Sequence, residues 1–335
     1  MPDSRSRVPL AQERGRLPTA EPRTVEGART DGAGIQDRGS DGPSSDAGAT
    51  ERSSAIHTTD GLRLTWRSWE CDGRTTRADL LIVPGLFEHS ERYRPLASYF
   101  TRRGYACHAL DLRGHGESEG RRVHVGDFAD YVRDVETVVD ALRSGPSPGR
   151  PLVLVGHSMG GVVAVHFALG HGEGLAGLVL SSPAFSAHPE NAPPGWLAAA
   201  GRLLAGIAPK TLIDARLDPA SISRDPEVVA AYRADPRIGS RVSARWFTAV
   251  SEAQRVCFKR ADELAVPALV LQAGADRLVD PEASRDWARR VQSRRGSAVR
   301  YREWAPCAHE LFNEPESLEI FGAVLAWLDE LFTPR

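Results

Sequence analysis

The stretch LVLVGHSMGG at 152–161 places one hydroxyl among glycines, directly after an apolar run. Gly156 and Gly160 flank Ser158 in a GxSxG pattern, which is typical of a sharp strand-to-helix turn that carries a nucleophilic serine. Such a turn also puts the serine at a helix N-terminus, where free N–H groups favour a developing negative charge. Because GxSxG occurs by chance, an inert serine in a glycine-rich connection is the alternative. The apolar run before Ser158 and the helical pattern after it favour a catalytic nucleophile.

A serine hydroxyl is a weak nucleophile at neutral pH, so Ser158 needs a general base, and that base needs an acid to orient it. After a serine in such a turn, the acid and then the histidine follow along the chain. His166 and His171 belong to the helical pattern after the turn, and His188 opens a long insertion. His309 alone follows a late strand pattern. We therefore expect His309 to be the base, with a surface-loop histidine as the alternative.

The acid is expected just after the apolar run ALVLQAG at 268–274. Asp276 is the nearest carboxylate to the end of that run, and Asp280 and Glu282 are its rivals. A carboxylate at a strand end can lie beneath an imidazole, whereas a residue that enters the next helix is less well placed. We therefore favour Asp276 and expect Asp280 to cap a helix that begins near Pro281.

Attack on an ester carbonyl creates an oxyanion, which two backbone N–H groups commonly stabilise. One donor is expected to be the amide of Met159, which follows the nucleophile, and the other the amide of Leu86, in the loop after LLIVPG at 80–85. This chemistry uses only the two amides. The alternative is that both residues are ordinary pocket wall.

An alternation of strand and helix patterns must position these residues. A hairpin pattern at 55–69 opens the series, and its two runs meet at Thr59-Asp60-Gly61. Strands are then expected at 79–85, 105–112, 151–156, 175–183, 266–274 and 297–304, and helices at 92–104, 128–142, 159–170, through Trp287 and Val291, and through Phe321, Leu325 and Trp327. Such an alternation predicts an α/β fold, in which a mostly parallel central sheet has helices on both faces.

Two parts of the chain do not follow this alternation. Residues 1–54 are rich in Gly, Ser, Asp, Arg, Pro and Ala and contain few large apolar side chains, which predicts a disordered tail, with a partner-binding arm as the alternative. Residues 55–335 are expected to form a single domain. Within it, the interval of about 185–258 has a mostly helical pattern and is expected to form a cap above the carboxyl ends of the strands, where open α/β sheets place their sites.

Composition and charge argue against several classes of function. The 335 residues are 41% apolar and 26% charged, enough for one large α/β domain, and the formal net charge of −2 does not indicate nucleic-acid binding. The four cysteines are scattered without a CxxC pair, and no histidine, cysteine and acid cluster has metal-ligand spacing, so no metal or cofactor is expected. No apolar run could span a bilayer and no signal peptide is evident, which predicts a cytoplasmic protein. Its oligomeric state is left open.

Several motifs together resemble a known family. From about Ala55 to Leu331 the chain is similar to the monoacylglycerol lipase and lysophospholipase group of the α/β-hydrolases, and the segment SISRDPEVVAAYRADP extends this likeness into the insertion. The other motifs that carry it are VPGLFEHSERYRPLASYFTRRGYACHALDLRGHGESEGRR at 83–122, GHSMGG at 156–161, ADRLVD at 275–280 and HELFNEP at 309–315.

The resemblance implies a serine hydrolase with Ser158 as nucleophile, Asp276 as acid and His309 as base. It also implies that Leu86 and Met159 donate the oxyanion hydrogen bonds.

The resemblance further implies that Glu88, Arg92 and Tyr232 lie near the polar end of the pocket, close to a glycerol headgroup. A structural ion pair of Glu88 and Arg92, and a place for Tyr232 in the core of the cap, are the alternatives. The run Arg113-Gly114-His115-Gly116 also matches the family, and we interpret it as loop architecture near the site.

One departure from the family concerns the oxyanion loop. Members commonly have His-Gly where this chain has Pro84-Gly85. Proline has a fixed φ and no N–H, but the amide of Leu86 remains. The departure therefore leaves open how firmly the loop is held.

The expected activity is hydrolysis of fatty-acid esters, with monoacylglycerol as the preferred substrate and no cofactor. A lysophospholipase, a broad carboxylesterase, an acyltransferase and a noncatalytic binding module are the alternatives. The apolar segment GWLAAAGRLLAGIAP at 195–209 could line an acyl tunnel and make a transient, peripheral contact with a membrane, or it could simply pack on the core. Cys307 lies close to His309, so thiol modification that blocks the site is a further hypothesis.

Overall fold

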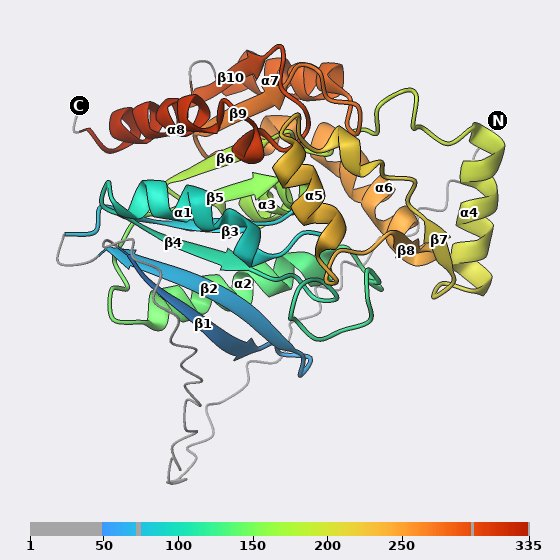
Figure 1. Ribbon diagram of the computed structural model, residues 1–335, viewed down its shortest axis with the longest axis horizontal. Coiled ribbons are helices and arrows are strands. Elements are labelled where there is room, and N and C mark those ends of the chain that lie inside the picture. Colours follow the sequence, from blue (N-terminus) through green and yellow to red (C-terminus); the bar gives the residue numbers. More distant parts are fainter. Residues whose placement is uncertain (1–48, 72–74, 296–297, 334–335) are drawn as a thin grey trace, which may run out of the picture. The chain divides into compact units, whose positions relative to one another are not determined.

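The computed structural model describes residues 49–71, 75–295 and 298–333 (Figure 1). Eight strands form one sheet in the order β1-β2-β4-β3-β5-β6-β9-β10. All neighbours from β4 to β10 are parallel, and β1 and β2 pair antiparallel at one edge. The expected α/β fold with a mostly parallel sheet is therefore confirmed. The strands are β1 (Ala49–His57), β2 (Arg63–Cys71), β3 (Ala78–Val83), β4 (Tyr105–Leu110), β5 (Leu152–His157), β6 (Gly177–Ser181), β9 (Ala268–Ala273) and β10 (Val299–Trp304).

The start of the sheet differs from the sequence-based boundary. Strand β1 begins at Ala49, so residues 49–54, which were expected to belong to a disordered tail, pair with β2 in the register Ala49↔Cys71 to His57↔Arg63. An edge strand is held by main-chain hydrogen bonds, so it needs few apolar side chains and composition does not reveal it. The rest of the expected tail, residues 1–48, lies outside the described residues.

Helices cover both faces of the sheet because its central strands are apolar on both sides. In β3, Leu80 and Ile82 point into one hydrophobic cluster, and Leu81 and Val83 point into the other. Helices α1 (Arg94–Thr101) and α8 (Ser317–Phe332) complete the first cluster, and α2 (Ala129–Ser144), α3 (Met159–His171) and α7 (Pro281–Arg295) complete the second. Strands buried on both faces read as continuous apolar runs, which is why the sequence pattern located them.

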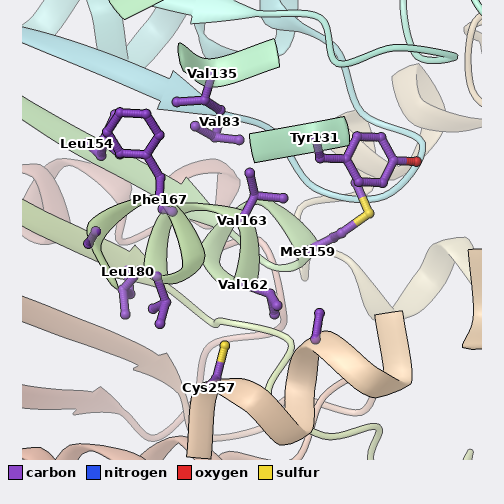
Figure 2. Close-up of a cluster of buried hydrophobic side chains, with 14 of the residues drawn as sticks. Val83, Tyr131, Val135, Leu154, Met159, Val162, Val163, Phe167, Leu180 and Cys257 are labelled. Atoms are coloured by element: carbon purple, nitrogen blue, oxygen red, sulfur yellow. The ribbon is translucent and has the colours of Figure 1, made fainter. Parts of the chain in front are cut away.

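Helix α3, which begins directly after Ser158, is buried on nearly every side. Figure 2 shows Val162, Val163 and Phe167 of this helix among side chains of the sheet, of α2 and of α6 (Ala244–Lys259). A helix that is apolar all round belongs inside a core. The N-terminus of α3 is thus held in place by packing on several elements.

The interval expected to form a cap lies between β6 and β9. Figure 1 shows its elements beyond the arrowheads of β4 and β5. This agrees with a position over the carboxyl ends of the central strands. Its elements are α4 (Gly195–Ile207), β7 (Leu212–Asp214), α5 (Pro226–Ala234), β8 (Arg241–Ser243) and α6, and β7 pairs antiparallel with β8.

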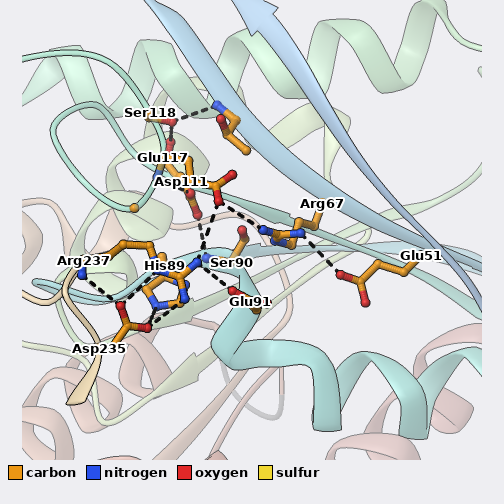
Figure 3. A network of polar contacts seen from close by, with 12 residues as sticks. Glu51, Arg67, His89, Ser90, Glu91, Asp111, Glu117, Ser118, Asp235 and Arg237 are labelled. Carbon is orange, nitrogen blue, oxygen red and sulfur yellow. Dashed lines mark hydrogen bonds and ion pairs between the residues drawn. The ribbon is translucent and has the colours of Figure 1, made fainter. Parts of the chain in front are cut away.

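Polar contacts tie this insertion to the sheet domain at the end of α5 (Figure 3). Asp235 Oδ2 lies 2.9 Å from Nε2 of the buried His89. Arg237 donates to Asp235 Oδ2 at 2.8 Å and to Glu91 Oε2 at 2.6 Å. Because His89 and Glu91 follow β3, these contacts join the insertion to the loop that also carries Leu86.

The run Arg113–Gly116 forms a structural loop, as the sequence analysis interpreted it. The Arg113 guanidinium donates to both carboxylate oxygens of Asp134, whose side chain is 0% exposed, and to Asp60. Gly114 has φ +71°, and a Cβ there would lie 2.4 Å from the Arg121 carbonyl oxygen. The arginine therefore anchors the loop to α2, and glycine permits its turn.

Loss of the buried partner of Arg113 should destabilise the protein strongly. Asp134→Ala removes the fully buried partner of the Arg113 guanidinium and leaves it only the half-exposed Asp60, so it is expected to lower the free energy of unfolding by about 3 kcal/mol. The control is Glu330→Ala, which breaks an exposed pair with Arg300 and should leave the free energy of unfolding nearly unchanged. Urea unfolding followed by tryptophan fluorescence measures both values. Equal losses in the two variants would contradict the structural role given to Asp134.

Candidate active site

Ser158 lies at the turn between β5 and α3, with φ 51° and ψ −120°. A Cβ at Gly156 would lie 2.5 Å from the Gly160 carbonyl oxygen, and a Cβ at Gly160 would lie 2.0 Å from the Val83 carbonyl oxygen. No side chain fits at either distance, so both glycines are required by the close approach of backbone to backbone. The serine is left in a strained, left-handed conformation between them.

His309 and Asp276 form a direct pair, as the sequence analysis expected. Nδ1 of His309 lies 2.7 Å from Asp276 Oδ2, and both side chains are buried. Asp276 Oδ1 accepts the N–H groups of Leu278 at 2.8 Å and Val279 at 3.0 Å. The turn after β9 thus holds the carboxylate, and the carboxylate orients the imidazole so that Nε2 is left for proton transfer.

The rival candidates lie elsewhere. Asp280 Oδ1 accepts the N–H of Glu282 at 3.0 Å at the start of α7, which is the capping role expected for it. Glu282 itself forms an ion pair with Arg285. His166 Nε2 lies 3.0 Å from the Ala253 carbonyl oxygen, on the side of α3 that faces α6.

The loop after β3 lies against the serine. A Cβ at Gly85 would lie 3.1 Å from Ser158 Cβ, so no other side chain fits between this loop and the turn without displacement. Within the described part of the chain, neither the Leu86 N–H nor the Met159 N–H has a hydrogen-bond acceptor. Unpaired amides beside a buried serine are the feature expected of an oxyanion site.

Glu88 holds the loop that contains Pro84. Its Oε2 accepts the Gly85 N–H at 2.7 Å and the Tyr93 hydroxyl at 2.7 Å. Burial opposes ionisation of Glu88, but the charge of Arg92 and these hydrogen bonds hold the pKa of Glu88 below its ordinary value. The loop is therefore anchored by a buried carboxylate.

The three residues assigned to the headgroup lie together, and Glu88 and Arg92 form the ion pair given as the alternative for them. Arg92 Nε lies 3.4 Å from Glu88 Oε1, so the two form an ion pair. The Arg92 guanidinium stacks over the Tyr232 ring at 4.9 Å and also contacts Glu310. Tyr232, on α5, is buried and joins the insertion to this ion pair.

Two residues beside the site were not singled out from the sequence. The rings of His157 and His309 have their centroids 4.8 Å apart, which links the serine turn to the histidine loop. His157 Nδ1 lies 3.1 Å from the Ser181 carbonyl oxygen, and burial lowers the pKa of His157 to about 4, so its ring is neutral. The second residue is Glu310. Both adjoin a candidate catalytic residue in the chain, which was the available signal.

Electrostatics favour His309 as a base. Burial alone would lower the pKa of His309, but the charge and hydrogen bond of Asp276 outweigh it and raise that pKa above its ordinary value. An imidazole with raised proton affinity, next to a nucleophile, is suited to accept a hydroxyl proton.

The environment of Cys307 argues against the thiol modification considered for it. Its thiol is buried, and burial together with Glu316 and Glu314 raises the pKa of Cys307 to about 12, so the reactive thiolate is rare. Cys307, Glu314 and Glu316 could in principle hold a metal ion. Arg224 pairs with both glutamates and offsets one of their two negative charges.

Comparison with known proteins agrees with this geometry. The Hydrolase_4 family, described as serine aminopeptidase S33, matches residues 74–316. A monoacylglycerol lipase of Mycolicibacterium smegmatis is 34% identical over 80% of this chain and 93% of its own length, and the phospholipase YtpA of Bacillus subtilis is 32% identical over 78% of this chain and 98% of its own. The crystal structure of a monoacylglycerol lipase from Paleococcus ferrophilus superposes with a TM-score of 0.71 at 28% identity, over 81% of this chain and 99% of that one.

The resemblance seen in the motifs is thereby confirmed. A strained serine in a strand-to-helix turn and a histidine–aspartate pair occur on the fold that these relatives share. The chain belongs to the Hydrolase_4 family and is a monoacylglycerol-lipase-like serine ester hydrolase with the α/β-hydrolase fold.

Proposed function

We propose that the protein hydrolyses monoacylglycerols, with Ser158 as nucleophile, His309 as general base and Asp276 as the orienting acid. The observation that carries the proposal is the buried His309–Asp276 pair beside the strained serine turn. Ser158 Oγ attacks the ester carbonyl while His309 Nε2 takes its proton. His309 then protonates the departing glycerol. Water, activated by the same imidazole, releases the fatty acid.

The oxyanion that forms in each step is assigned to the Leu86 and Met159 amides. Both N–H groups lack acceptors in the described chain and flank the serine turn. Met159 N–H also begins α3, so the helix dipole adds to the favourable field. The buried Glu88 keeps the Leu86 loop in position during turnover.

The substrate class follows from the relatives and from the insertion. The Mycolicibacterium relative is named a monoacylglycerol lipase, which favours an acylglycerol. The Bacillus relative is named a phospholipase, which makes a lysophospholipid the second candidate. The insertion also carries the apolar helix α4, which favours a lipid over a small polar ester.

We also propose that the enzyme contacts a lipid surface through α4. Trp196, Leu203 and Ile207 are 73%, 67% and 75% exposed and share one face of this helix, opposite the buried Ala205. Arg202 and Arg245 line a cavity of about 570 Å³ beside the helix. Within the described residues, no helix is both long and apolar enough to cross a bilayer. The contact would therefore be interfacial.

The role of Asp276 can be separated from that of its neighbour. Asp276→Asn should lower kcat by about 10⁴-fold, because an amide does not hold the required imidazole tautomer. Asp280→Asn is the matched control and should stay near wild type, since asparagine caps a helix as well as aspartate does. Steady-state kinetics on a soluble p-nitrophenyl ester measures both. A large loss in Asp280→Asn, or none in Asp276→Asn, would overturn the assignment.

A substrate panel tests the function itself. Monooleoylglycerol should be cleaved faster than a lysophosphatidylcholine, p-nitrophenyl acetate or an aminoacyl p-nitroanilide, and a fluorophosphonate probe should label wild type but not Ser158→Ala. Preference for lysophosphatidylcholine would support the second candidate. Preference for the acetate would indicate a short-chain esterase, and preference for the anilide a peptidase. Equal labelling of Ser158→Ala would rule out Ser158 as the nucleophile.

The lipid contact is tested with a double variant. Leu203→Ser with Ile207→Ser should reduce co-sedimentation with vesicles of phosphatidylcholine and phosphatidylglycerol and raise KM for vesicle-borne monooleoylglycerol, because apolar area is lost. Hydrolysis of a soluble p-nitrophenyl ester should stay unchanged. Leu318→Ser is the matched control, because this leucine is 69% exposed on α8. Unchanged vesicle binding in the double variant would argue against α4 as the contact.

A further inference from the structure

Glu310 directly follows His309, and the proposed mechanism does not use it. Its side chain is 4% exposed. One carboxylate oxygen, Oε2, contacts Arg92 and accepts a hydrogen bond from Asn313 Nδ2 at 2.9 Å. A buried carboxylate next to a catalytic base needs an explanation, because desolvation makes such a position costly.

Glu310 lies where three separate segments meet. Through Arg92 it is connected to Glu88, which holds the Gly85 N–H of the proposed oxyanion loop. Its own N–H donates to the Ile222 carbonyl oxygen of the insertion at 2.7 Å. The histidine loop, the oxyanion loop and the insertion are thus connected through this one residue.

The charges around Glu310 do not balance. Two buried carboxylates, Glu88 and Glu310, share the single guanidinium of Arg92. Burial raises the pKa of Glu310 to about 7 despite the attraction of Arg92, and the charge on Glu88 adds to the rise. At neutral pH its charge is therefore poised to change. The groups that face it from the surrounding elements are Arg92, Tyr93, Glu88, His309, Asn313 and, from α5, Tyr232.

The charge of Glu310 acts on the base beside it. Burial disfavours the charged His309 ring, Asp276 favours it most, and Glu310 adds to that effect. A negative Glu310 thus raises the proton affinity of His309, and a neutral side chain there lowers it.

We propose that Glu310 is a positioning residue for the hydrolysis: it ties the His309 loop to the Leu86 loop through Arg92 and supplies a second negative charge, after Asp276, to the imidazole. The inference rests on the proposed function. His309 must be neutral to accept the serine proton, so kcat/KM is lost as the pH falls through the pKa of His309. Removal of the Glu310 charge lowers the pKa of His309, so kcat/KM is then lost only at a lower pH.

The test compares Glu310→Gln with Glu310→Asp on a soluble p-nitrophenyl ester. Glu310→Gln keeps an oxygen for Arg92 and Asn313. The acidic limb of its kcat/KM profile against pH should move by about one unit to lower pH. Glu310→Asp keeps the charge, so its limb should stay near that of wild type while kcat falls because the shorter side chain is displaced from Arg92. Asp280→Asn, which removes a carboxylate outside this cluster, should leave the limb unmoved.

A second measurement needs no variant and no turnover. The ring protons of His309, followed by NMR in the wild-type protein, should titrate in two steps, one of which disappears in Glu310→Gln. A single step in wild type and an unmoved limb in Glu310→Gln would overturn the proposal. Wild-type protein that cleaves no ester would instead contradict the proposed function, and the NMR titration would still decide whether Glu310 acts on His309.

Discussion

The approach of Gly160 to the end of β3 is the contact on which the active-site region depends. The carbonyl groups of Val83 and Pro84 lie so close to this glycine that a Cβ would be 2.0 and 2.5 Å from their oxygens. The chain must therefore turn within one residue, and Ser158 takes the left-handed conformation that the turn requires. Because α3 is packed on several sides, it cannot move to relieve the strain. The same contact brings the Leu86 loop to the serine.

Buried charges hold the loops around this turn. Regular secondary structure ends before the residues that would do chemistry, so another interaction must restrain them. Asp276 is fixed by two loop amides, Glu88 fixes Gly85, and Arg92 lies between Glu88 and Glu310. In a region of low dielectric each of these pairs is costly to break, because one partner would be left as an uncompensated charge. The loops are thereby more rigid than their irregular backbone suggests.

The insertion combines two different surfaces. Near the site, its α5 end is polar: Asp235 and Arg237 pair with core residues, and Tyr232 packs on Arg92. Away from it, α4 presents apolar side chains to solvent, among them Trp196 and Ile207. The insertion is therefore polar where it meets the loop after β3 and apolar where it faces solvent.

Local patterns determined much of the molecule. Continuous apolar runs such as 80–83 located the parallel strands, because these strands are buried on both faces. The spacing of Gly156 and Gly160 predicted the serine turn, because a Cβ at Gly156 would meet the Gly160 carbonyl oxygen, a contact between residues near in sequence. Asp276 could be distinguished from the capping Asp280 because it lies just past a strand, and that position is visible in the local sequence.

Other features were decided only by the tertiary structure. The first strand begins at Ala49 because main-chain pairing with β2 holds polar residues that composition assigns to a tail. Glu88 acts as the anchor of a loop, and Glu310 joins Arg92 from a position 218 residues away in the chain. No local pattern reports such a pair, because its energy depends on how completely the folded protein excludes water from two charges that the sequence keeps far apart.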